Sequence, residues 1–540
     1  MIASLQDLSL NAFIGLLPTE LTPEDETQLH FLTHFFIDSQ LSTHICLQII
    51  EQKKDLRLLS YFSNNTLSII PPLKQLHKGA LDCLDITKIL LEAFPNLKAL
   101  DFSEQKLTSL GQLNLAGHNK GFNLKKLNLS DTDIANLDNL DFPLLEELDL
   151  SYCRKLPAEE FLKLKDKFPH LKKLNLNGTL IASLDGLDLP LLEELNLDYC
   201  NELLADEFLT LQYPNLKKLD LFGTQIASLE GLEFPFLEEL NLGDCRRLPP
   251  AEFLTLKDKF PHLKKLSLKN TKIASLDGLD FPQLEELNLG NCINLLPEEF
   301  LTLQCPNLKK LDLFGTQIAS LEGLEFPFLE ELNLGDCRRL PPAEFLTLKD
   351  KFPHLKKLSL KNTKIASLDG LDFPQLEELN LGNCINLLPE EFLTLQCPNL
   401  KKLHLTGTYI ASLEGLDLPY LEELNLSDNF WLEEILKLKC PNLKKLDLFG
   451  TQIASLEGLE FPFLEELNLG DCRRLPPAEF LKLKDKFPHL KKLDLFGTQI
   501  ASLEGLELPL LEELEISRCQ NLTAEEFLKL KTKCPNLKKP

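Results

Sequence analysis

Several features that define common classes of protein are missing from this sequence. It contains no run of about 18 apolar residues, which a membrane-spanning helix would require. Residues 1–7 contain no Lys or Arg, whereas a secretion signal begins with positive charge. From these two absences we expect neither membrane insertion nor a cleaved leader. We therefore expect a cytoplasmic chain, or one delivered into a host cytoplasm.

The sequence also lacks the charge of a nucleic-acid-binding protein. Its formal net charge is -25, and no long block of Lys or Arg is present. Because neutralised phosphates supply most of the affinity for nucleic acid, we expect no nucleic-acid partner.

Motifs of catalytic and cofactor sites are absent as well. The sequence has no Gly-x-Gly-x-x-Gly, Walker loop, His-Glu-x-x-His or Gly-x-Ser-x-Gly. Acidic pairs such as Glu330-Glu331 recur in every long repeat, as scaffold residues would and a unique catalytic pair would not. His30 and His34 have a spacing that is compatible with a metal, but no pattern supplies further ligands. We expect no enzyme, no cofactor and no metal site.

Leucine is abundant, and it is periodic. From about residue 95 the motif Leu-x-x-Leu-x-Leu returns, with eighteen copies counted from Leu124. Two kinds of repeat alternate: Pro214 to Pro235 is 21 residues, whereas Pro235 to Pro261 is 26. Self-similarity at this period indicates a solenoid built from two-strand units.

The two kinds of repeat predict different connections between strands. The short repeat, residues 306–326, is too short for a helix on its outer side. The long repeat, residues 327–352, has Pro341-Pro342 suited to a first helical turn. An apolar stripe follows, and Pro353 ends the helix. We expect the convex side to alternate short loops with short helices.

Eight of the fourteen cysteines share one position of the repeat. They are Cys153, Cys200, Cys245, Cys292, Cys337, Cys384, Cys472 and Cys519. On alternate strands they would lie roughly 9 to 10 Å apart. Because a disulfide requires alpha carbons within about 7 Å, these cysteines are expected to be free thiols.

The ends of the array differ from its middle. Residues 1–94 lack the motif and predict a small helical cap, with a helix start at Thr22-Pro23. Residues 95–540 form the predicted solenoid. At the other end, either a helix near residues 525–533 caps the array or the chain continues beyond it.

The repeats resemble the leucine-rich-repeat family, and the long ones resemble its cysteine-containing subclass. Cys292 and Cys384 match the conserved strand position, and Cys305-Pro306 and Cys397-Pro398 match the helix end. The short repeats have Thr where the family usually has Asn. The resemblance implies an α/β right-handed solenoid, a horseshoe of about twenty parallel strands with a concave sheet. It also implies a monomeric protein-interaction scaffold, either an adaptor or a bacterial effector.

Two alternative functions remain open. Leu17-Pro18-x-Glu20 resembles the opening of an F-box, which would make the chain a substrate-binding adaptor of a ubiquitin ligase. Residues 214–305 recur letter for letter as residues 306–397, which suggests a structural spacer without a dedicated ligand. A solenoid tolerates such a duplication because each repeat contacts only its neighbours.

Strict alternation along each strand predicts the binding surface. If Leu311 and Leu313 face the core, Lys310, Asp312 and Phe314 face the concave surface. Lys-Lys and Glu-Glu on neighbouring strands then form a ladder of charges that either fixes the register or recognises a partner. The variable concave positions are the candidate protein-binding residues Asp220, Phe222, Lys269, Asp312, Phe314, Lys361, His404, Asp447, Phe449, Asp494 and Phe496.

The aromatic residues have two possible roles. Gly243, Gly335 and Gly470 flank the phenylalanines and are expected to leave the rings uncovered as anchors for a partner. Alternatively, the rings lie flat on neighbouring side chains. The one tryptophan, Trp431, lies in a shortened long repeat, where it either plugs the convex side or marks a contact site.

Overall fold

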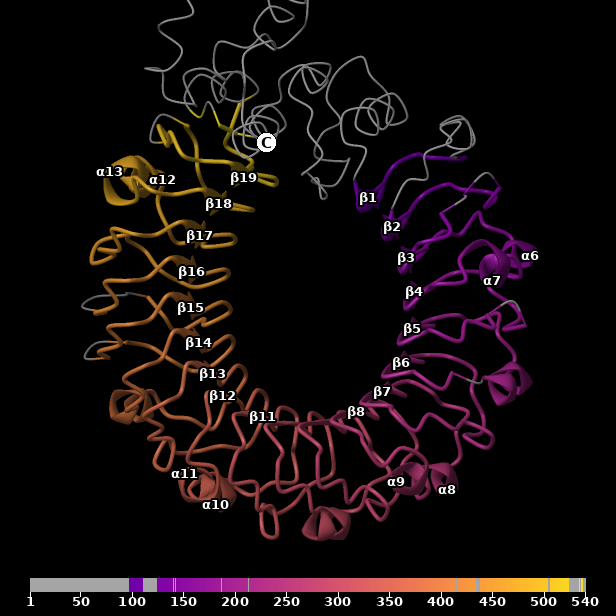
Figure 1. Cartoon of the computed structure of the whole chain (residues 1–540). Helices are drawn as coiled ribbons and strands as arrows, with labels where there is room; N and C mark the ends of the chain where they lie inside the picture. Colours follow the sequence, from indigo (N-terminus) through magenta and orange to yellow (C-terminus); the bar gives the residue numbers. More distant parts are fainter. Residues whose placement is uncertain are drawn as a thin grey trace, which may run out of the picture. The chain divides into compact units, whose positions relative to one another are not determined.

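The computed structural model describes residues 97–109 and 124–523, except residues 139, 141, 186, 212, 414–415, 434–437 and 504–505, and also residues 534, 536 and 537. The described chain forms two compact units. The first runs to Glu252 and includes Asp258–Leu263, and the second comprises Phe253–Lys257 and the described residues from Lys264 onward. In each unit the strands line the inner side of a curve and the helices lie on its outer side (Figure 1).

Each strand is three residues long and pairs in parallel with the next strand in its unit. The first unit contains β1 (Ala99–Asp101), β2 (Lys126–Asn128), β3 (Glu147–Asp149), β4 (Lys173–Asn175), β5 (Glu194–Asn196), β6 (Lys218–Asp220) and β7 (Glu239–Asn241). The second unit contains β8 (Lys265–Ser267), β9 (Glu286–Asn288), β10 (Lys310–Asp312), β11 (Glu331–Asn333), β12 (Lys357–Ser359), β13 (Glu378–Asn380), β14 (Lys402–His404), β15 (Glu423–Asn425), β16 (Lys445–Asp447), β17 (Glu466–Asn468), β18 (Lys492–Asp494) and β19 (Glu513–Glu515). The predicted parallel solenoid is confirmed.

The repeat leucines form the core, as their spacing predicts. In β10, Leu311 is 2% exposed and pairs in register with Leu332 of β11. The following Leu313 is fully buried. Period-two alternation therefore places every second side chain of the strand on the open face.

The outer side alternates loops and short helices, but the helices differ from the predicted ones. Long repeats carry either a pair of four-residue helices or one 3₁₀ helix. The pairs are α6 (Ala158–Phe161) with α7 (Leu164–Lys167), α8 (Pro250–Phe253) with α9 (Leu256–Lys259), α10 (Pro342–Phe345) with α11 (Leu348–Lys351), and α12 (Pro477–Phe480) with α13 (Leu483–Lys486); the 3₁₀ helices are η5 (Ala205–Thr210), η6 (Pro297–Thr302) and η7 (Pro389–Thr394). The predicted stripe is broken because Phe345 and Leu348 are fully buried whereas Leu346 is 47% exposed.

A buried ladder of Thr and Cys holds the turn after each strand. Thr316 Oγ donates a hydrogen bond of 2.8 Å to the carbonyl of Leu313, and the Cys337 thiol donates to the same carbonyl at 3.1 Å. One carbonyl thus joins two consecutive repeats. The Thr that replaces the family's Asn fills the same turn.

The shortened repeat uses an asparagine in this ladder. Asn429 is fully buried, and its Nδ2 donates to the carbonyls of Leu405 and Leu426, both at 2.8 Å. Its Oδ1 accepts a hydrogen bond from Thr408. One amide therefore makes the bonds that a Cys and its neighbours make elsewhere.

The described cysteines are all buried and free, as predicted. Burial raises the pKa of Cys337 to about 11 and that of Cys245 to about 12. These thiols are packing groups and not nucleophiles.

Other predictions fall outside the described residues. These include the helical cap at residues 1–94, the F-box-like opening, His30 and His34, and the helix near residues 525–533. Among the helices of the described ranges, none has both the length and the apolar character needed to cross a membrane.

Candidate functional site

The open face of each sheet carries the residues that alternate with the leucines. In β10 the Lys310 side chain is exposed and Asp312 is half-buried; Phe314, two residues after β10, is half-buried as well. The equivalent residues of the other short repeats occupy the same two rows. The alternation that defined the candidate site is thus present, and it brings the candidates together in rows along each sheet.

Ion pairs run across the strands along this face. Lys310 lies between Glu286 at 3.6 Å and Glu331 at 3.7 Å. A second row beside it includes Lys309 paired with Glu285 at 2.8 Å. These pairs are well exposed, so each contributes little to stability, and the two charges cancel along the sheet.

The half-buried aspartates of the open face also hold the backbone that follows each strand. Asp312 Oδ1 accepts a hydrogen bond of 2.9 Å from the backbone N–H of Phe314. Asp220, Asp447 and Asp494 each accept an equivalent hydrogen bond from the backbone N–H of the phenylalanine two residues later. Burial raises the pKa of the Asp312 carboxyl, against the opposing effects of that N–H and of Lys269.

The phenylalanine rings are partly covered, which corrects the prediction that the glycines leave them uncovered. A Cβ added to Gly335 would lie 2.9 Å from Cδ2 of Phe314, so the ring rests on that glycine. Phe222 rests on Gly243 in the same way. The glycine that follows the next strand therefore makes room for the half-buried ring.

The rings of Phe222 and Phe496, the first and last phenylalanines of the row, have additional contacts. Tyr199 meets Phe222 edge to face, with ring centroids 5.3 Å apart. The guanidinium of Arg518 lies 5.1 Å above the centre of the Phe496 ring. Phe449 rests on Gly470, as Phe314 does on its glycine.

The remaining candidates change the charge of the face along the second unit. Lys269 and Lys361 replace phenylalanine, and Lys269 lies across β9 from Asp312, above Gly290. His404 is half-buried, and burial raises the pKa of the Asp447 carboxyl two strands away, against the opposing effect of the Phe449 N–H. Aromatic, basic and small polar residues thus replace one another at this position along a constant framework.

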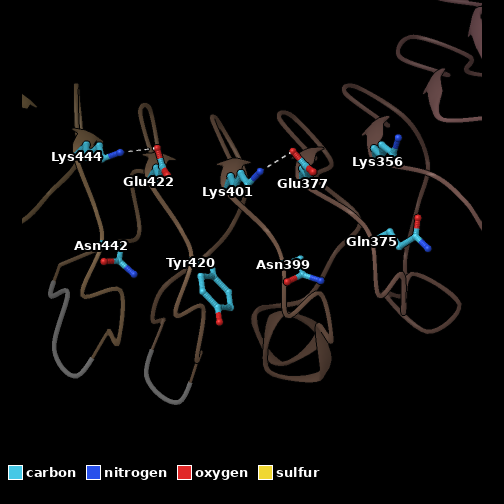
Figure 2. A pocket seen from close by; sticks show the side chains of 9 residues that line it. All are labelled: Lys356, Gln375, Glu377, Asn399, Lys401, Tyr420, Glu422, Asn442 and Lys444. Carbon is cyan, nitrogen blue, oxygen red and sulfur yellow. Dashed lines mark hydrogen bonds and ion pairs between the residues drawn. The ribbon is translucent and has the colours of Figure 1, made fainter.

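A groove lies beside the sheet, where the chain enters the strands. It measures about 400 Å³ and is lined by Lys356, Gln375, Glu377, Asn399, Lys401, Tyr420, Glu422, Asn442 and Lys444. Figure 2 shows two rows, with the charged residues at the strand starts and Gln375, Asn399, Tyr420 and Asn442 beneath them. Lys401 pairs with Glu377 and Lys444 with Glu422, both at 2.9 Å.

The sequence reasoning missed the apolar side chains of this edge. Tyr420 is 57% exposed, Phe463 56% and Leu510 40%. Each follows the proline that precedes a long repeat, and a leucine follows each of them. The signal was a large apolar residue at this position in most of the two-strand units, outside the alternating core pattern.

Trp431 does not plug the convex side. Its side chain is 63% exposed, and the neighbouring Phe430 is 61% exposed. The shortened repeat is closed by the hydrogen bonds of Asn429 instead.

Comparison with known proteins agrees with this geometry. A sequence model described as "Leucine Rich repeats (2 copies)" matches residues 261–301 and 353–393. The chain is built of leucine-rich repeats. The leucine-rich repeats form an extended open sheet face, which is the surface that such solenoids generally use for interaction. No curated protein matches the chain significantly.

Three solved structures are similar to the chain. One is a TLR13–ssRNA13 complex (19% identity, TM-score 0.45, covering 86% of this chain and 83% of the other). Another is the mouse RP105/MD-1 complex (18% identity, TM-score 0.47, covering 83% and 86%). A third is a leucine-rich-repeat protein of Leptospira interrogans (23% identity, TM-score 0.39, covering 80% and 98%). At these identities and scores the similarities carry no information about a ligand.

Proposed function

We propose that the chain is a non-catalytic scaffold that binds a protein ligand on the open face of its leucine-rich-repeat sheet. We further propose that it acts as a monomeric adaptor in a cytoplasm. The candidate contacts are the half-exposed phenylalanines and the basic residues that replace them. The aspartates support these side chains by fixing the backbone beneath them.

One observation carries this proposal. The framework of the face, its leucines and ion pairs, is nearly constant from repeat to repeat, whereas the position of Phe314 holds Phe, Lys, Thr, Asn or Ser in the equivalent repeats. A ring that rests on Gly335 loses little mobility on binding, because it is already held in place. Preordered, half-exposed aromatic rings are well suited to anchor a partner.

The test compares capture of proteins from the native cell extract. The variant Phe314→Ala/Phe449→Ala/Phe496→Ala should retain about tenfold less of its main partner than the intact chain, since aromatic anchors dominate interface energies. Captured proteins would be quantified by mass spectrometry.

A matched control removes exposed apolar side chains from a different surface of the same unit. Tyr420→Ala/Phe463→Ala/Leu510→Ala should leave the capture of that main partner unchanged. Equal capture by the intact chain and by the triple phenylalanine variant would reject the sheet face as the binding surface.

A further inference from the structure

A second exposed row follows the edge where the chain enters the strands of the second unit. Each of its members lies three residues before the first residue of its strand. From β13 to β19 this strand-entry row consists of Gln375, Asn399, Tyr420, Asn442, Phe463, His489 and Leu510. Large apolar side chains thus alternate with hydrogen-bonding side chains from Asn399 to Leu510. This row is separate from the sheet face proposed above as the protein-binding surface.

The spacing of the apolar members restricts what can lie on them. Tyr420, Phe463 and Leu510 belong to β15, β17 and β19, so each is two strands from the next. At about 4.8 Å per strand the repeat distance is roughly 9.6 Å. A polyproline II helix has three residues per turn and about 3.1 Å per residue, which gives a repeat of roughly 9.3 Å.

Other peptide conformations fit this spacing less well. Side chains on one face of an extended strand recur at about 6.6 Å. Two turns of an α-helix recur at about 10.8 Å. Over the two steps from Tyr420 to Leu510 the polyproline mismatch is therefore smaller than that of either alternative.

The residues between the apolar side chains offer hydrogen-bond donors. Asn442 Nδ2 donates to the Pro419 carbonyl at 2.7 Å, and Asn399 Nδ2 donates to the Pro374 carbonyl at 2.7 Å. An amide NH₂ has two hydrogens, so each asparagine keeps one for a ligand. A polyproline II chain makes no internal hydrogen bonds and presents its carbonyls to such donors.

The charge of the groove also points to an uncharged ligand. The wall above the row pairs Lys401 with Glu377 and Lys444 with Glu422 (Figure 2). Further along the row, Lys491 pairs with Glu465 at 2.8 Å. A charged peptide would have to break these pairs or lie beside a like charge. A proline-rich segment has no charged side chains, so it can lie beside these ion pairs without disrupting them.

We propose that the strand-entry row binds a proline-rich segment of another protein in the polyproline II conformation. Proline rings lie on Tyr420, Phe463 and Leu510, and the intervening asparagines donate to the peptide carbonyls. This mode combines aromatic contacts with a ligand that is ordered before it binds, as other proline-recognition grooves do.

The experiment measures binding of a labelled peptide of about ten prolines, roughly 31 Å long, by fluorescence anisotropy. Tyr420→Ala/Phe463→Ala/Leu510→Ala should weaken binding about tenfold or more, because it removes all three apolar contacts. Phe314→Ala/Phe449→Ala/Phe496→Ala should bind the peptide as the intact chain does. Failure of the sheet-face proposal would therefore leave this result untouched, and the reverse also holds.

A gain-of-function variant tests the spacing independently. Gln375 is the member of the row two strands before Tyr420, so Gln375→Tyr would extend the run of large apolar side chains by one step. It should tighten binding of the proline peptide by about threefold. Absence of saturable binding, equal binding of a glycine-serine peptide of the same length, or tighter binding of an alanine-rich helical peptide would each overturn the proposal. Unchanged binding of the proline peptide by Tyr420→Ala/Phe463→Ala/Leu510→Ala would also overturn it.

Discussion

Asp198 places a carboxyl group at a position of the sheet face where the other long repeats have Gly or Ser. It occupies the position that is glycine in the repeats of Gly243 and Gly335. Asn177 Nδ2 donates to its Oδ2 at 3.0 Å, but its buried Oδ1 has no hydrogen-bond partner. Burial, and secondarily the charge of Asp220, raises the pKa of Asp198 from 3.8 to about 6.

This raised pKa predicts how stability changes with pH. The folded state holds the Asp198 proton up to about pH 6, whereas the unfolded chain releases it near 3.8. Stability from this group therefore falls as pH rises between these values and stays reduced above them. Asp198→Asn should stabilise the protein by about 1 to 2 kcal/mol at neutral pH, allowing for partial solvent screening.

The same substitution should have almost no effect near pH 4, where the native carboxyl is already neutral. Urea unfolding of both proteins at the two pH values measures the difference. An equal effect at both values would show that the charge of Asp198 carries no penalty.

At the scale of elements, the sequence predicted the features that recur in every repeat. It missed the contacts that a side chain makes with the neighbouring strand. The spacing of Leu311 and Leu313 predicted both the strand and its buried face, because alternation is a local property. The contact between Phe314 and Gly335 could not be predicted, since it requires the path of the ring across two strands. Likewise, the break after Phe345 depends on which side chains the core can accommodate.

A double-mutant cycle tests that contact. Gly335→Ala should destabilise the protein by about 1 to 3 kcal/mol, because the new Cβ would meet the Phe314 ring. In a Phe314→Ala background the same change should cost much less. Thermal or urea unfolding of the four proteins gives the coupling energy.

Gly382 provides the matched control. Lys361 stands before it where Phe314 stands before Gly335, and the contacts of its added Cβ include no ring: they are Thr406 at 3.5 Å and Asn380 Oδ1 at 3.2 Å, the latter as for Gly335 and Asn333. Gly382→Ala should therefore cost less than Gly335→Ala. Costs that are equal at both glycines and independent of Phe314 would contradict ring packing.

At the scale of the molecule, the duplicated block repeats its contacts as well as its letters. Lys257 pairs with Asp280 at 2.8 Å in the first copy, and Lys349 pairs with Asp372 at 2.6 Å in the second. Deleting residues 306–397 would join Cys305 to Pro398, recreating a sequence that the chain already contains. Every remaining repeat would keep neighbours of the kind it has now.

The shortened chain should therefore fold, with an unfolding midpoint within about 4 °C of the full chain. Circular dichroism during heating checks this. A loss of cooperative unfolding would mean that the two copies are not interchangeable, despite their identical sequences.

The central claim, that the open sheet face holds a protein ligand, is tested most directly by photo-crosslinking in living cells. A benzophenone side chain would replace Phe314 or, as a control, Leu346, which is 47% exposed beside α10. We expect one protein to crosslink from position 314 and not from position 346. Crosslinking of that protein only from position 346, or equally from both, would contradict binding at the sheet face.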